Sequence, residues 1–175
     1  MIKVNDSAEF KRLIGALSDD IVSAAIHWRM QCDLLESMKE YPLVRQQSNT
    51  FWHLTLNAHV RTAIQYLCRA FDQEQRSLHL LSWLLTIKEN LHLFSTTEFR
   101  NRLAHNAFVD SLANGDIKPD EAQLNKDIEL CKASDPLVRK LVSFRGSSVA
   151  HRSATLTRGG AALPANMVLS VPEFE

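Results

Sequence analysis

Apolar residues return at every third or fourth position through most of the chain, and this period predicts helices rather than strands. Ser18-Asp19-Asp20 offers a second N-cap inside the longest such stretch, 7–41, which leaves open a short helix followed by a long one. Pro42 marks the end of the stretch, because a proline restricts the backbone of the residue before it. The apolar face of this stretch is formed by Phe10, Leu13, Ile14, Leu17, Ile21, Ala25, Trp28, Cys32 and Leu35.

The same period predicts five further helices, at about 49–71, 78–89, 96–114, 119–133 and 136–153. Ser77, after a polar turn at 72–76, is the expected N-cap of the helix at 78–89. Ser95 and Glu98 form a capping box at the start of the helix at 96–114. The helix at 78–89 is apolar almost all round and is expected near the centre. Since no stretch alternates as a strand does, the sequence predicts an all-α, single-domain, up-and-down bundle of five to seven helices.

The character of the chain changes after Ser153. Residues 154–175 contain two adjacent glycines, two prolines and little periodicity, which is typical of a loop or tail. We therefore expect a helical domain at 1–153 and a loop or tail at 154–175.

Charge and composition narrow the function classes. The 20 basic and 20 acidic residues give a formal net charge of zero. This argues against a large basic surface that binds duplex nucleic acid but is compatible with a local basic cleft. Cys32, Cys68 and Cys131 lie far apart in helical contexts and are expected to be reduced core thiols of a cytoplasmic protein. No apolar run approaches the roughly 18 residues of a membrane helix, so we expect no membrane partner.

Histidines and carboxylates do not form a metal-binding pattern. His53 and His59 are six residues apart, whereas a metal pair on one helix face needs a separation of three or four. His79, on an apolar helix, is expected to be a hydrogen-bonded core or interface residue. We predict neither a metal ion nor another cofactor.

The most informative stretch is 135–154, where Arg145 and His151 end an apolar helical pattern that begins at Pro136. Six positions along a straight helix place the two side chains roughly 120° apart, so they do not share a face unless the helix breaks or a second copy approaches. Gly146 favours such a break. The permanently charged guanidinium of Arg145 beside the imidazole of His151, which titrates near neutrality, suits the binding and cleavage of a phosphodiester. The alternative is a solvated arginine and a half-buried histidine without any catalytic role.

A second arginine–histidine pair with the same kind of spacing lies at Arg100 and His105. Arg102 precedes His105 by three residues, so these two are expected to meet on one helix face. We favour Arg145 and His151 as the functional pair, and a groove lined by both pairs is a further alternative.

The Arg145 spacing to Ala150-His151-Arg152-Ser153 resembles the R-X4-6-H motif of the HEPN superfamily (higher eukaryote and prokaryote nucleotide-binding domains). Residues 67–84 and 140–153 together resemble its abortive-infection U-type (AbiU-like) branch, and the likeness extends from about Phe51 to Ser153. In that family one more helix usually follows the motif helix. The chain stops at Glu175, about where it would begin, so we expect at most a truncated final helix.

The resemblance implies a HEPN-like, metal-independent endoribonuclease of the toxin or phage-defence type, which acts as a homodimer. Arg145 would hold the phosphate and His151 would transfer the proton. Further RNA-binding candidates are Ser148, Arg152, Arg100, Arg102 and His105, and a cognate antitoxin protein is an implied partner. One departure from the family is Gly146, where active members commonly carry Asn, Asp or His. The alternative is therefore a catalytically degenerate module that binds RNA or a protein partner.

Overall fold

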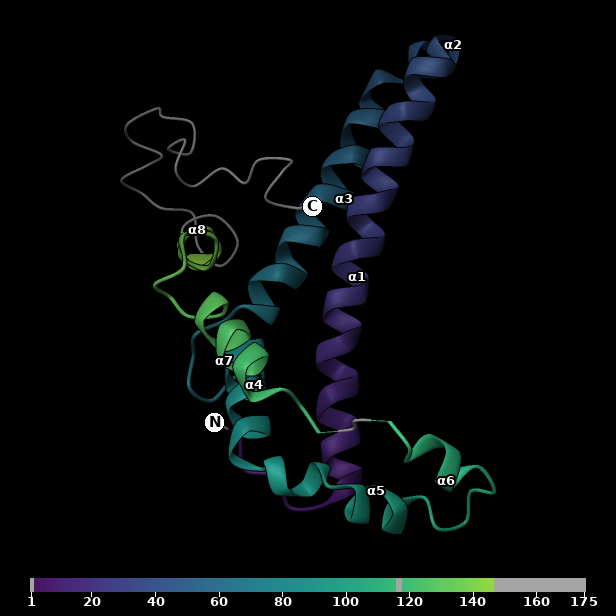
Figure 1. Cartoon of the computed structure of the whole chain (residues 1–175). Helices are drawn as coiled ribbons and strands as arrows, with labels where there is room; N and C mark the ends of the chain where they lie inside the picture. Colours follow the sequence, from purple (N-terminus) through teal and green to yellow (C-terminus); the bar gives the residue numbers. More distant parts are fainter. Residues whose placement is uncertain (1, 116–117, 147–175) are drawn as a thin grey trace.

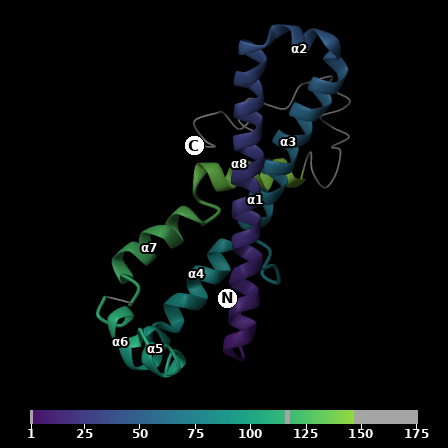
Figure 2. The same cartoon turned by 90° about the vertical axis from the view of Figure 1, so that its right-hand side faces the viewer.

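A long antiparallel pair of helices organises the molecule, for which a computed structural model describes residues 2–115 and 118–146. Helix α1 (Ser7–Glu40) and helix α3 (Asn49–Ala70) run side by side along much of their length, and the short helix α2 (Pro42–Gln47) joins them at one end (Figures 1 and 2). Pro42 ends α1 as predicted and also occupies the first turn of α2. Apolar side chains are exposed at this end of the pair, namely Tyr41, Leu43, Val44, Phe51 and Leu54.

Helix α1 is continuous through the expected second N-cap. Instead of capping a helix, the Asp20 carboxylate lies 2.7 Å from Arg69 of α3 and is almost buried. Seven residues further along α1, His27 Nδ1 lies 2.9 Å from His59 Nδ1, a second polar contact between the two helices. Of the two alternatives left open for this stretch, the structure has the single long helix, and the Asp20 side chain is used between helices.

Helix α4 (Leu80–Glu89) begins later than predicted, because His79 rather than Ser77 is its N-cap. The His79 side chain accepts from the Ser82 N–H, and the Ser82 hydroxyl accepts from the His79 N–H. Trp83 of α4 packs in a core cluster with Leu17 of α1 and Ala70 of α3. His79 is 4% exposed, which confirms its expected place as a hydrogen-bonded core residue.

The single helix predicted at 96–114 is wrong. The structure has a 3-10 turn η1 (Leu91–Phe94), helix α5 (Thr96–Arg102) and a four-residue helix α6 (Val109–Leu112). Ser95 caps α5 as expected, but the Asn106 side chain accepts from the Phe108 N–H and so favours a turn between α5 and α6. Phe108 is 71% exposed, so no buried apolar stripe offsets this local preference.

The last two described helices follow their local signals closely. Asp120 caps α7 (Glu121–Leu130) and Asp135 caps α8 (Pro136–Phe144), with Pro136 in the first turn as predicted. Helix α8 crosses α3, where Leu141 packs in a cluster with Ile64 and Cys68. Arg145 and Gly146 continue α8 as a π-type turn, and the rest of the helix predicted to 153 lies outside the described residues.

The described residues form eight α-helices and contain no strand, which confirms the all-α, HEPN-like fold class. Helices α2 and α6 have six and four residues, and the other six α-helices have seven or more, in line with the predicted five to seven. Cys32, Cys68 and Cys131 are free thiols; Cys68 and Cys131 are buried as predicted, whereas Cys32 is only partly buried. Within the described part of the chain, every helix is too short or too polar to cross a bilayer.

The contact of α8 with α3 provides a test of the fold. Leu141 is 2% exposed, whereas Leu130 at the end of α7 is 61% exposed. We expect Leu141→Ala to lower the free energy of unfolding by about 2–5 kcal/mol, the usual cost of a cavity at a buried leucine. Leu130→Ala should change it by no more than about 0.5 kcal/mol. Urea denaturation followed by circular dichroism measures both, and equal costs would contradict this packing.

Candidate functional site

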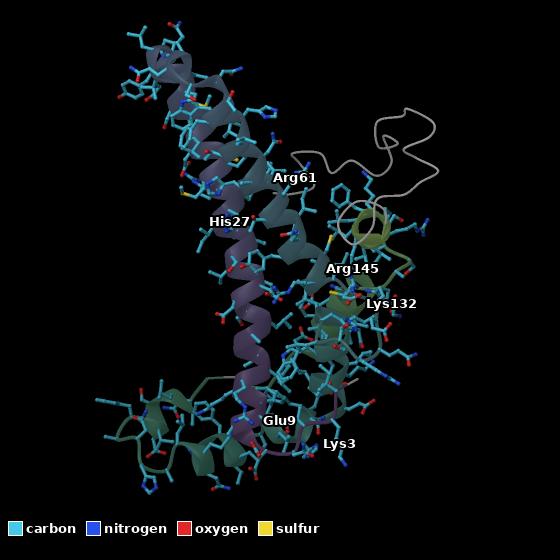
Figure 3. The ribbon with its side chains drawn as sticks, turned by 180° about the vertical axis from the view of Figure 1, so that it is seen from behind. Lys3, Glu9, His27, Arg61, Lys132 and Arg145 are labelled. Carbon is cyan, nitrogen blue, oxygen red and sulfur yellow. The ribbon has the colours of Figure 1, made fainter. Side chains whose placement is uncertain are left out.

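Arg145, the arginine of the favoured pair, stands at the end of α8 and forms an ion pair with Asp72, which follows α3 (Figure 3). Its Nη1 group donates to Asp72 Oδ1. The Asp72 side chain is 10% exposed and that of Arg145 is 44% exposed. One part of the guanidinium group is therefore held against a nearly buried carboxylate, while much of the side chain faces solvent.

The Asp72 carboxylate is itself held in place by the loop that contains it. Asp72 Oδ1 accepts from the backbone N–H groups of Gln73 at 2.8 Å and Glu74 at 3.2 Å, so the loop bends around its own first side chain. Gln73 Nε2 donates to the Cys131 carbonyl at 3.1 Å, which ties the loop to the end of α7. The position of Asp72 is thus set by α3, by its own loop and by α7.

Asp72 keeps its negative charge in spite of this burial. Burial alone would raise the pKa of the carboxyl group, but hydrogen bonds from Ser77, Glu74 and Gln73, together with the positive charge of Arg145, lower it below its ordinary value. Asp72 is therefore ionised at neutral pH, and its attraction for Arg145 is present under physiological conditions.

Two titratable groups near this pair, Cys68 and His79, favour their uncharged forms. Burial raises the pKa of the Cys68 thiol to about 11, against the opposing effect of Arg145, and its Sγ lies 3.5 Å from the Leu141 carbonyl. Burial also lowers the pKa of His79, although the charge of Asp72 opposes the shift. Neither group has the properties of an activated nucleophile or of a cation that binds phosphate.

The partner histidine of the favoured pair, His151, lies outside the described residues, as do Ser148 and Arg152. The distance between Arg145 and His151 therefore stays a prediction. Gly146 forms a π-type turn with Arg145, a feature often found at functional sites, and is the last residue described, so the break expected there stays a prediction.

The second pair, Arg100 and His105, is separated by the end of a helix. Helix α5 ends at Arg102, so His105 lies beyond it. The expectation that Arg102 and His105 meet on one helix face is therefore wrong. Arg102 donates to the carbonyls of Leu93 and Glu98, and Arg100 lies 3.5 Å from Asp110. Helices α5 and α8 lie far apart in both views, which also excludes one groove lined by Arg100 and Arg145 of the same chain (Figures 1 and 2).

Asp72 is not among the residues predicted from the sequence, because the polar turn predicted at 72–76 does not distinguish it from its neighbours. Its position in the sequence could have indicated a functional role. Asp72 lies in 67–84, one of the two stretches that resemble the family, and Arg145 lies in the other, 140–153. An acidic residue in one such stretch and an arginine in the other make a natural candidate pair.

Comparison with known proteins places the chain in a family. The family model HEPN_AbiU2, described as AbiU2, matches residues 7–175. No curated protein and no solved structure matches the chain. Among the described residues, no group of three or more His, Cys, Asp or Glu side chains is placed to hold a metal ion.

The cap of α4 provides a test of the electrostatics near the site. The pKa of His79 lies below its ordinary value of 6.5, so the folded protein favours the neutral ring that accepts from Ser82. The stabilisation is therefore complete above the unfolded value and is lost as the pH falls below 6.5 toward the folded pKa. His79→Asn keeps a capping acceptor that does not titrate, and we expect it to remove this part of the pH dependence.

Thermal unfolding at a series of pH values measures the effect. His105→Asn, in an exposed turn, is the matched control and should keep the pH dependence of the unmodified protein. If His79→Asn kept the pH dependence of the unmodified protein, His79 would not be its source.

Proposed function

Because the chain belongs to the AbiU2 family of HEPN domains, we propose that this abortive-infection-type protein is a metal-independent endoribonuclease that acts through Arg145 and His151. The observation that carries the proposal is the anchored, half-exposed Arg145 at the end of α8. An arginine fork has five N–H donors, so a bond to Asp72 leaves others for a phosphate group. The proposal places the protein in the cytoplasm with RNA as its substrate.

The chemistry needs only groups that RNA and two side chains provide. The 2′-hydroxyl oxygen of RNA attacks the adjacent phosphorus, and the bond from phosphorus to the 5′-oxygen of the next nucleotide breaks. His151 takes the proton of the 2′-hydroxyl, and a proton is returned to the leaving 5′-oxygen by the same imidazole or by that of a second copy, while Arg145 binds the phosphate oxygens on which charge develops. The products are a 2′,3′-cyclic phosphate and a free 5′-hydroxyl.

A dimer completes this proposal. Arg145 and His151 are offset by roughly 120° on a straight helix, so one chain does not easily direct both at the same phosphate. Two copies related by a two-fold axis would place two motifs around one cleft. Ser148 and Arg152, which flank His151, would then contact the RNA.

A module that binds without cleaving is the second candidate, and two observations favour it. The charge of Arg145 is already compensated by Asp72, and Gly146 supplies no side chain to orient an imidazole. In this alternative, Arg145 and His151 bind RNA or a protein partner such as a cognate antitoxin, and no bond is broken.

The test of the enzyme is incubation of the purified protein with a mixed RNA pool in EDTA. We expect cleavage to a 2′,3′-cyclic phosphate, detected by end-specific labelling of the products. His151→Ala should reduce the rate by about 10²-fold or more, the low end for a general acid–base residue. Arg145→Ala should also reduce it, and Arg145→Lys should recover only part, because lysine lacks the planar fork.

His105→Ala is the control variant, since it alters the other histidine of an arginine–histidine pair. It should change the rate far less than His151→Ala. Loss of cleavage in His105→Ala with full activity in His151→Ala would show that the wrong pair was chosen. Binding of RNA without any cleavage by the unmodified protein would support the binding module.

The dimer is tested separately by light scattering at concentrations of tens of micromolar, about where a weak interface becomes populated. We expect twice the mass of the 175-residue chain. A charge reversal at the motif, Arg145→Glu, should shift the protein toward the monomer if this segment lies in the interface. A monomer in the unmodified protein would contradict the dimeric site.

A further inference from the structure

We propose that Asp72 is the positioning residue of this site: its carboxylate holds the Arg145 guanidinium in the orientation in which the remaining donors meet the RNA phosphate. This inference rests on the proposed function of Arg145. It adds a residue from the loop after α3, 73 positions away from Arg145 in the sequence, to a motif that otherwise spans only residues 145–151.

The first support is the asymmetry of the pair. The Asp72 side chain is almost buried and is fixed by the N–H groups of Gln73 and Glu74, whereas Arg145 is long and extends to solvent. The fixed member therefore determines where the mobile member lies. A long side chain that is already ordered loses less conformational freedom when its ligand arrives, which is the general advantage of a preorganised site.

The second support is that the contact joins a functional arginine to a rigid part of the fold. Gln73, next to Asp72, is tied to Cys131 at the end of α7, and α8 is packed on α3 through Leu141. Arg145 thus receives its backbone position from α8 and its side-chain orientation from a different part of the fold. Such double support is what a catalytic geometry requires, since a misplacement of about 1 Å can cost as much as 10²-fold in rate.

A closely similar ion pair elsewhere in the chain shows how a purely structural role can be separated from a positioning role. Asp20 is 8% exposed, as is Asp72, and it lies 2.7 Å from Arg69 between α1 and α3. Arg69 also lies over the Tyr66 ring, 5.4 Å from its centroid, so this pair is part of helix packing. Asp20→Asn is therefore the matched control for Asp72→Asn.

The kinetic experiment measures kcat and KM for RNA cleavage in EDTA with the full chain. Asp72→Asn should lower kcat by about 10-fold to 100-fold and leave KM unchanged or lower, because Arg145 keeps its charge but loses its orientation. Asp72→Glu, which restores a carboxylate, should recover part of kcat. Asp20→Asn should leave kcat within about twofold. The double variant Asp72→Asn/Arg145→Ala should be no slower than Arg145→Ala alone.

A chemical measurement tests the contact without any need for cleavage. Phenylglyoxal reacts with arginine side chains, and an ion-paired guanidinium is shielded from it. We expect labelling of Arg145, followed by peptide mass spectrometry, to become several-fold faster in Asp72→Asn and to stay unchanged in Asp20→Asn.

The outcomes separate the two proposals. No cleavage by the unmodified protein would defeat the proposed function alone, and the labelling rate of Arg145 would still decide whether Asp72 holds it. Unchanged labelling in Asp72→Asn would overturn the inference. So would faster labelling with an unchanged kcat in an active enzyme, because the contact would then be structural. Additive losses in the double variant would overturn it as well.

Discussion

The packing of α8 across α3 is the interaction on which the candidate site depends. Leu141 and Cys68 meet in this contact, and burial of apolar surface there is worth roughly 25 cal/mol for each Å² removed from water. Without it, the end of α8 would have no defined place relative to the loop after α3. The orientation of Arg145 is thus a consequence of hydrophobic packing one turn earlier in the same helix.

Placing a charged pair next to that apolar contact has an energetic cost that the loop offsets. A nearly buried carboxylate is unfavourable unless hydrogen bonds and an opposite charge compensate it. For Asp72, backbone N–H groups of its own loop donate the hydrogen bonds and Arg145 provides the opposite charge. Because Asp72 has partners besides Arg145, its buried charge does not depend on the guanidinium alone.

Local signals predicted the elements that local interactions determine. Asp135 and Pro136 begin α8 as expected, because a cap and a first-turn proline act within a few residues. The continuity of α1 and the pairing of Asp72 with Arg145 could not be predicted in this way. Both depend on partners 49 and 73 positions away, Arg69 for Asp20 and Arg145 for Asp72, and no periodic pattern within a helix records such a contact.

The exposed apolar end of the α1–α3 pair affects how the fold comes apart. Leu43 is 73% exposed and Tyr41 is 61% exposed, so α2 gains little from burial, whereas Ala63 and Ala70 of α3 are fully buried. We therefore expect amide protons near α2 to exchange with solvent through small local openings, and those in the middle of α3 to exchange only when the larger structure opens. Fraying is then expected to begin at the end far from α8, while Asp72 and Arg145 stay joined.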